Sequence, residues 1–252
     1  MSPRRHQSFV GMDRAFWPLL GVLGLVLLGF ELTDLDLVVQ DPLYDAQAGR
    51  WRVDAADPLL RAIFYTGPKV LLILLGVASI ALAAGPVRWR AALGFSSPDS
   101  RRHLIVLVAT LATGPALVGW GKSATNVFCP SEIRRYGGDV PYVTLCGSYP
   151  ADDRPARAGH CFPAGHASGG FALVALAGIA RTGRGRRLGL AAGVAAGGIM
   201  GAYQMLKGAH YLSHTVFTLA AIAWIFLLWR RLLGVASRGP ADSVDPGLQR
   251  GA

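Results

Sequence analysis

Residues 188–209 read LGLAAGVAAGGIMGAYQMLKGA, an apolar run that is rich in Gly and Ala. A run of about 20 apolar residues is long enough to cross a bilayer as a helix. Helices in a membrane associate largely by close packing, which small side chains permit. We therefore expect this run to be a membrane-spanning helix at the centre of a helical bundle.

The composition of the whole chain is that of an integral membrane protein. Of its 252 residues, 52% are hydrophobic and only 16% are charged, whereas about a quarter of the residues in an ordinary soluble domain are charged. Several other apolar runs approach or exceed the length of a span. The sequence therefore predicts an all-α integral membrane bundle of six transmembrane helices, at residues 16–30, 62–84, 104–120, 164–180, 188–209 and 216–229.

Arginine clusters between the apolar runs set the predicted orientation. The formal net charge is +10, but the basic residues gather in short segments between spans, as they do in cytoplasmic loops. This placement argues against binding to nucleic acid. We expect residues 1–234 to form the membrane domain with both termini cytoplasmic, and residues 235–252 to be a disordered cytoplasmic tail. The clusters are Arg4, Arg5 and Arg14; Arg88, Arg90, Arg101 and Arg102; Arg181, Arg184, Arg186 and Arg187; and Arg230 and Arg231.

Two polar segments are then expected on the non-cytoplasmic side. Residues 34–61 are acidic on balance and should form a loop with short amphipathic helical pieces at the membrane surface. Residues 121–164 form the longest polar segment, and a loop of this length is uncommon unless it is functional or disordered. It holds all three cysteines of the chain, so one pair is expected to be bridged if the compartment is oxidising.

This topology brings Lys122, His166 and His210 out at the same membrane face. Polar residues at membrane depth are costly, so several of them at the mouths of spans indicate a site. A helix that begins at Ala164 and Gly165 would also point its unpaired backbone N–H groups at this face. Those groups and the positive end of the helix dipole favour an anion.

A second group of polar residues recurs at steps of three, three and four: Gln204, Lys207, His210 and His214. These steps place the residues on one face if the segment is helical. Such a stripe could hold and attack a phosphate, bind a metal, or simply satisfy its own hydrogen bonds. Against a zinc site, Tyr211 stands where the zincin pattern has Glu beside the first histidine, and no acidic ligand lies nearby in the sequence.

Three short stretches resemble the motifs of the type-2 phosphatidic acid phosphatase superfamily of membrane lipid phosphatases. The family patterns are Lys-x6-Arg-Pro, Pro-Ser-Gly-His and Ser-Arg-x5-His-x3-Asp. Order and spacing agree throughout, over roughly residues 120–220. The matching stretches are Lys122-x6-Cys129-Pro130, Pro163-Ala164-Gly165-His166 and Tyr203-Gln204-x5-His210-x3-His214.

The resemblance implies roles for the two histidines that occupy family positions. His210 would attack phosphorus and form a phosphohistidine, and His166 would protonate the leaving alkoxide. Covalent catalysis divides one difficult displacement into two, and an imidazole titrates near neutral pH. Lys122, Lys207 and the helix start at Gly165 would stabilise the phosphoryl group without a metal or other cofactor.

The departures from the family pattern affect the phosphate clamp and the residue that orients the nucleophile. Cys129 and Gln204 replace two arginines, which removes two bidentate donors. We expect Lys207, one turn from Gln204, and Arg134 and Arg135, just beyond Cys129, to substitute for them, and Gln204 itself to contact the phosphate. His214 replaces the orienting Asp; it can accept a hydrogen bond but cannot stabilise an imidazolium as a carboxylate does. Other possible orienting carboxylates are Asp139, Asp152 and Asp153.

Two of the cysteines, Cys129 and Cys161, each adjoin one of these motifs. A disulfide between them would tie the long loop to the start of the fourth span. The alternative is two buried thiols.

The expected function is that of a lipid phosphatase in the cytoplasmic (inner) membrane, with its site facing the periplasm or cell exterior. Its substrate would be a phosphomonoester or pyrophosphate on a membrane lipid. The alternatives are a lipid phosphotransferase, in which a lipid accepts the phosphate, and a catalytically silent relative that binds or transports phospholipid. The sequence gives no indication of the oligomeric state.

Overall fold

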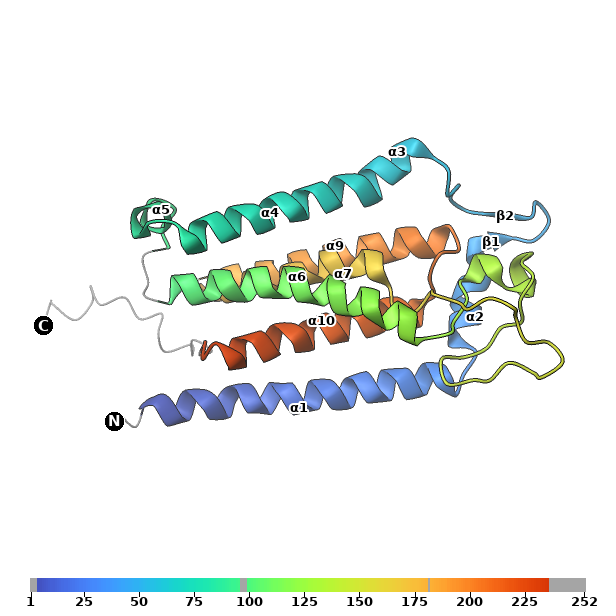
Figure 1. Cartoon of the computed structure of the whole chain (residues 1–252), viewed down its shortest axis with the longest axis horizontal. Helices are drawn as coiled ribbons and strands as arrows, with labels where there is room; N and C mark the ends of the chain where they lie inside the picture. The colour runs from blue at the N-terminus through green and yellow to red at the C-terminus, as the bar shows by residue number, and fades with distance from the viewer. Residues whose placement is uncertain (1–3, 96–98, 181, 236–252) are drawn as a thin grey trace, which may run out of the picture.

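The computed structural model describes residues 4–95, 99–180 and 182–235, and most of them are helical (Figure 1). The predicted helical class is confirmed. Long helices run side by side; the irregular loop, α2 at Leu35–Gln40 and the two short strands gather at one end of them, and the short helix α5 at Val87–Ala92 lies at the other (Figure 1). The first residue of α1, Arg4–Glu31, and the last residue of α10, Leu212–Leu232, lie together at the opposite end. The predicted tail beyond residue 235 and Arg181 lie outside the described residues.

Four of the described helices are long and apolar enough to cross a membrane. The first of them joins α3, Pro58–Arg61, a π-helical turn η2, Ala62–Thr66, and α4, Gly67–Ala84. Two shorter apolar helices accompany them: Trp17–Glu31 within α1, and Gly165–Ile179, which joins α7, Gly165–Ala172, η5, Leu173–Ala175, and α8, Leu176–Ile179. The four long segments are Pro58–Ala84, α6 at Ser100–Ala124, α9 at Gly183–Leu206, and α10. These segments indicate a multi-pass membrane protein.

Glycines let α9 approach α7 closely, as residues 188–209 predicted. A Cβ on Gly197 would lie 2.1 Å from the ring of Phe171, and a Cβ on Gly193 would lie 2.3 Å from the backbone N of Val174. Both distances are too short for a larger residue, so the packing requires Gly at both positions. The main apolar core lies beside this contact, among side chains of α6, α7 and α10 such as Leu107, Phe171 and Ile222.

The outward face of α4 is apolar and exposed. Its large side chains include Leu71 and Leu74, which are 67% and 58% exposed. A soluble protein rarely exposes so continuous an apolar surface, whereas lipid covers such a face without cost. A further short helix, α5 at Val87–Ala92, follows α4 at the end remote from the loop (Figure 1).

The segment between α1 and α3 holds a short helix and a hairpin. The helix α2, Leu35–Gln40, agrees with the predicted helical piece and is followed by η1, Asp41–Leu43. The hairpin, which the sequence pattern did not indicate, pairs β1, Tyr44–Asp45, with β2, Arg50–Trp51, in an antiparallel ladder. Its aromatic rings pack on Tyr136 of the long loop, with ring centroids 5.0–5.4 Å apart.

The long loop begins later than expected, because α6 continues to Ala124. It contains two 3-10 turns, η3 at Pro130–Glu132 and η4 at Arg134–Tyr136. Ion pairs hold it in shape: Arg134 with Asp153, Arg135 with Asp41, and Arg157 with both Glu132 and Asp139. The loop is therefore an ordered cap on the end of the helices.

Candidate active site

The turn between α9 and α10 carries the central histidine of the stripe. The expectation that residues 204–214 form one helical face is wrong, because α9 ends at Leu206 and α10 begins at Leu212. Gly208 has a φ of +73°, which favours glycine strongly and ends the helix. The resulting turn places His210 next to His214 from the start of the following helix.

Two buried polar side chains of α2 hold the two ends of this turn. Asp36 accepts hydrogen bonds from the backbone N–H of Ser213, at 2.9 Å, and from its hydroxyl. Gln40, one helical turn later, donates from Nε2 to the carbonyl of Met205 at 2.8 Å. Asp36 and Gln40 are only 5% and 0% exposed, and burial raises the pKa of the Asp36 carboxyl above its usual value. Together they satisfy backbone groups at the end of α9 and the start of α10.

Backbone contacts from other segments complete the enclosure of the turn. Ser131 N–H donates to the carbonyl of Gly208 at 2.9 Å, and Val53 N–H donates to the carbonyl of Leu206 at 3.1 Å. The indole of Trp51 lies directly on Gly208, since a Cβ there would be 2.3 Å from the ring. The turn is therefore held from three sides, by α2, by β2 with the residues after it, and by η3.

The two histidines form a buried pair. Nδ1 of His210 lies 3.3 Å from Nδ1 of His214, and the residues are 2% and 3% exposed. A hydrogen bond between these nitrogens uses one ring nitrogen of His210 and leaves Nε2 for another partner. Burial, and next the positive charges nearby, hold the pKa of His210 well below its usual value. His210 is therefore neutral near pH 7.

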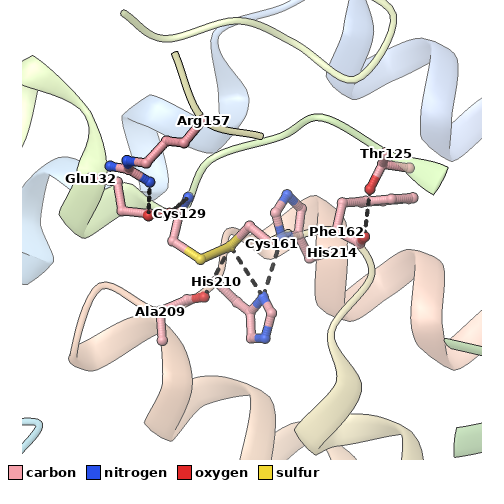
Figure 2. Close-up of a disulfide and its surroundings, with 9 residues drawn as sticks. All are labelled: Thr125, Cys129, Glu132, Arg157, Cys161, Phe162, Ala209, His210 and His214. Carbon is pink, nitrogen blue, oxygen red and sulfur yellow. Dashed lines mark hydrogen bonds and ion pairs between the residues drawn. A yellow bond between two sulfur atoms is a disulfide. The ribbon is translucent and has the colours of Figure 1, made fainter. Parts of the chain in front are cut away.

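A disulfide between Cys129 and Cys161 lies against this pair, as Figure 2 shows. It joins the two cysteines that adjoin the sequence motifs. The sulfur of Cys161 lies 3.5 Å from Nδ1 of His210 and 3.1 Å from the carbonyl oxygen of Ala209. The bond joins two parts of the long loop and holds them against the turn, while Cys146 is a free, exposed thiol.

His166 lies in the first turn of α7 and faces the pair across a short gap. Its ring centroid is 6.2 Å from that of His210, and 4.7 Å from that of Tyr65 in η2. Lys122 reaches over the same helix start, because a Cβ on Gly165 would lie 3.7 Å from its Nζ. The amine and the N-terminal N–H groups of α7 thus converge near His166, an arrangement suited to an anion.

An apolar cavity of about 550 Å³ extends from His166 along the bundle. Its polar residues lie toward one end, and its walls come from the π-helical turn, α4, α6, α7 and α9. The lining residues are Tyr65, Lys69, Leu72, Ile73, Gly76, Val77, Ile80, Val108, Leu111, Ala112, Pro115, Lys122, Gly165, His166, Gly169 and Met200.

Several predicted clamp residues lie elsewhere. Arg134 and Arg135 are about half exposed, bind Asp153 and Asp41, and do not line the cavity. The expectation that they substitute for the missing arginines therefore has no support in their positions. Gln204 is 1% exposed, and in the described part of the chain its side-chain amide has no hydrogen-bond partner.

The two remaining groups of predicted site residues are also placed by the structure. The amine of Lys207 lies 4.9 Å from the centre of the Tyr203 ring, and burial lowers its pKa. Two of the alternative orienting carboxylates, Asp139 and Asp153, are engaged by Arg157 and Arg134 in the loop. Asp152 is exposed on the same loop.

Cys161, His210 and His214 are the one group within the described residues whose ligand atoms are spaced to hold a metal ion, all within 4.8 Å of one another. The thiolate is the form of cysteine that binds metals, and the sulfur of Cys161 is bonded to Cys129. With the disulfide formed, two imidazoles remain. They are also the pair whose spacing fits a direct hydrogen bond.

The family model of the PAP2 superfamily matches residues 103–235, which is more than half of the chain. The chain belongs to the PAP2 superfamily. Members of the superfamily are phosphatases, so membership supports phosphatase-type activity on phosphate esters. No curated protein and no solved structure matches the chain significantly.

The matched PAP2 region includes Lys122, His166 and His210. It begins after α2 and α4, so it contains neither helix. Sequence patterns therefore missed Asp36 and Gln40, which hold the turn, and Tyr65 and Lys69, which line the cavity. A signal for the first pair exists, since Asp36 and Gln40 are polar residues four apart in the otherwise apolar segment LDLVVQ. Lys69 shows no comparable pattern.

We predict that Asp36→Ala lowers the thermal stability of the purified protein and its activity together. The substitution leaves the N–H of Ser213 buried without an acceptor, which costs about 1–3 kcal/mol. The measurement is the midpoint of thermal unfolding in detergent. Asp34→Ala, at an exposed position two residues earlier, is the matched control and should leave the midpoint unchanged. Equal midpoints for the two variants would contradict the role given to Asp36.

Proposed function

We propose that this protein is a six-span membrane phosphatase that hydrolyses a phosphomonoester or pyrophosphate on a lipid. Both termini would lie in the cytoplasm, and the site would open at the outer face of the cytoplasmic membrane. The two shorter apolar helices, Trp17–Glu31 and Gly165–Ile179, would be the additional spans. The arginine clusters support this orientation through the positive-inside rule.

The observation that carries the lipid substrate is the cavity. One end holds His166 and Lys122, and the walls are otherwise mostly apolar, such as Leu72, Ile80 and Val108. Tyr65 and Ile80 both line it, and fifteen residues of helix correspond to roughly 22 Å. A phosphate at the polar end would leave an attached hydrocarbon chain lying along the apolar walls. A small soluble phosphate ester would leave those walls unused.

The chemistry proposed for the site has two displacements. Nε2 of His210 attacks phosphorus, the bond to the lipid oxygen breaks, and His166 donates a proton to that leaving oxygen. Water then attacks the phosphohistidine, giving up a proton to His166, and phosphate departs from His210. In both steps the equatorial oxygens of the phosphoryl group are stabilised by Lys122, Lys207 and the N–H groups at Gly165. These steps use no metal.

His214 would hold His210 in the reactive form. If Nδ1 of His210 carries the proton, it donates to Nδ1 of His214, and Nε2 has its lone pair free. Neutral His214 stabilises an imidazolium at His210 less than a carboxylate would. The exchange of Asp for His thus favours a neutral nucleophile at the expense of charge stabilisation later in the reaction.

Two alternatives follow from the same site. In a phosphotransferase, a lipid hydroxyl takes the place of water in the second step. In a silent relative, the site binds phospholipid without turnover, and the replacement of the family's clamp and orienting residues by Cys129, Gln204 and His214 favours this reading. Phosphate release from a panel of long-chain lipid phosphates separates the three: release indicates hydrolysis, transfer to an added lipid alcohol indicates phosphotransfer, and neither indicates binding.

We predict that His210→Gln abolishes phosphate release, by roughly 10³-fold or more, because it removes the nucleophile. His214→Gln, which retains a hydrogen-bonding side chain beside His210, should be impaired less. Both variants should keep the unfolding midpoint within a few degrees of wild type. Residual turnover by His210→Gln close to the wild-type rate would exclude the phosphohistidine mechanism.

The pH dependence of kcat/KM provides a second test. Protonation of His210 removes its nucleophilic lone pair, and its pKa lies well below the usual value of about 6.5. We therefore expect His210 itself to remain reactive as the pH falls through 6.5. His214→Asp places a carboxylate beside the ring, which favours the imidazolium and raises the pKa of His210. The acid limb of this variant should lie at higher pH than that of wild type with the same substrate. Coincident limbs would contradict the role of the pair.

We predict that Gly76→Leu discriminates between lipid and soluble substrates. Gly76 lines the cavity, and a Cβ at this position meets no atom within 4 Å, so a larger side chain fits without disturbing the fold. It would occupy the space proposed for the hydrocarbon chain. Turnover of a long-chain lipid phosphate should fall about tenfold, while turnover of p-nitrophenyl phosphate should not change.

Gly119→Leu is the matched control for this test. Gly119 is exposed on α6, a Cβ there also meets no atom within 4 Å, and the residue does not line the cavity. It should leave both substrates unaffected. An equal loss with both substrates in Gly76→Leu, or an equal loss in the control, would remove the support for a chain along α4.

A further inference from the structure

The helical segment before the matched region contributes two polar residues to the cavity. Tyr65 belongs to the π-helical turn Ala62–Thr66, and Lys69 belongs to the first turn of α4. Both line the cavity that also contains His166 and Lys122. A single π-helical turn within a longer helix is rare and is frequent at functional sites. In this chain the turn carries Tyr65, whose ring packs against the ring of His166.

The site lacks two cations, because the family motifs have arginine at the positions of Cys129 and Gln204. Cys129 is bonded to Cys161, and Gln204 has a neutral buried amide. A phosphoryl group carries up to two negative charges, and each lost arginine would have given two parallel hydrogen bonds. The arginines next to Cys129 are occupied in the loop, as described above. Lys207 does not line the cavity, so beside Lys122 a further cation would have to come from a different segment.

Lys69 is placed to be that cation. It lines the cavity, it is exposed, and in the described part of the chain no ion pair involves it.

We propose that Lys69 binds the phosphoryl group of the substrate together with Lys122, in place of the arginines absent at positions 129 and 204. The proposal rests on the lipid-phosphatase function above and adds a residue outside the family motifs. The substrate would then lie with its phosphate between α4 and the start of α7. Its chain would follow α4 along the cavity.

Tyr65 would act as a positioning residue in the same arrangement. Its ring is 4.7 Å from that of His166, centroid to centroid, and the guanidinium of Arg61 lies 5.7 Å from the centre of the Tyr65 ring. The turn that presents Lys69 to the phosphate therefore also packs on the imidazole proposed to protonate the leaving group. One segment supplies both contacts.

The test compares Lys69→Met and Lys69→Arg with wild type, using the full chain in detergent and a long-chain phosphatidic acid. Lys69→Met should raise KM, or lower kcat/KM, by about tenfold or more, because a charge-assisted hydrogen bond to the phosphate is lost. Lys69→Arg should restore most of the activity. The control is Arg88→Met, an exposed cation on α5 at the far end of α4, which should change nothing. Equal effects of Lys69→Met and Arg88→Met would show that Lys69 is only an interfacial charge and would overturn the proposal.

A binding measurement separates this proposal from the function it rests on. Orthovanadate mimics a phosphoryl group, and its affinity can be measured by calorimetry whether or not wild type hydrolyses lipids. Absence of lipid phosphatase activity with tight vanadate binding, weakened about tenfold by Lys69→Met, would refute the enzyme and support Lys69. Unchanged affinity in Lys69→Met, or no binding by wild type, would overturn the role of Lys69.

Discussion

The arrangement of the candidate site depends on the buried hydrogen bonds from α2 to the turn between α9 and α10. Asp36 and Gln40 are removed from water, so each must find a partner within the protein. They find it in backbone groups at the end of one helix and the start of the next. A helix end that is buried without such partners is unstable. The short helix α2 therefore helps to fix the position of the turn that carries His210.

The disulfide and the glycines act on the same turn from other directions. Cys161 lies against His210 and is bonded to Cys129, while Gly208 permits both the left-handed backbone and the contact with Trp51. These contacts hold His210 and the residues before it in place, which is the condition for a preorganised site.

Length and composition were sufficient to predict the long apolar helices, because a span requires about 20 apolar residues whatever its neighbours are. The topology inferred from the arginine clusters predicted that Lys122, His166 and His210 share one face. The turn at Gly208 was missed, since a glycine beside an apolar run can also be helical, and only the contact with Trp51 distinguishes the two cases. The partners of Asp36 and Gln40, and those of Arg134 and Arg135, could not be predicted, because they lie 19 to 177 residues away in the sequence.

The departures from the family motifs are connected by charge. Replacing two arginines with Cys129 and Gln204 lowers the positive charge at the site, and replacing an Asp with His214 lowers the negative charge beside the nucleophile. A carboxylate next to His210 would stabilise its protonated, unreactive form, and fewer cations would be present to oppose that. With a histidine in this position, burial, and next the positive charges nearby, hold the pKa of His210 well below its usual value. The loss of the Asp is thus compatible with the loss of the arginines, and in the proposed function the phosphate would be held by the lysines that line the cavity.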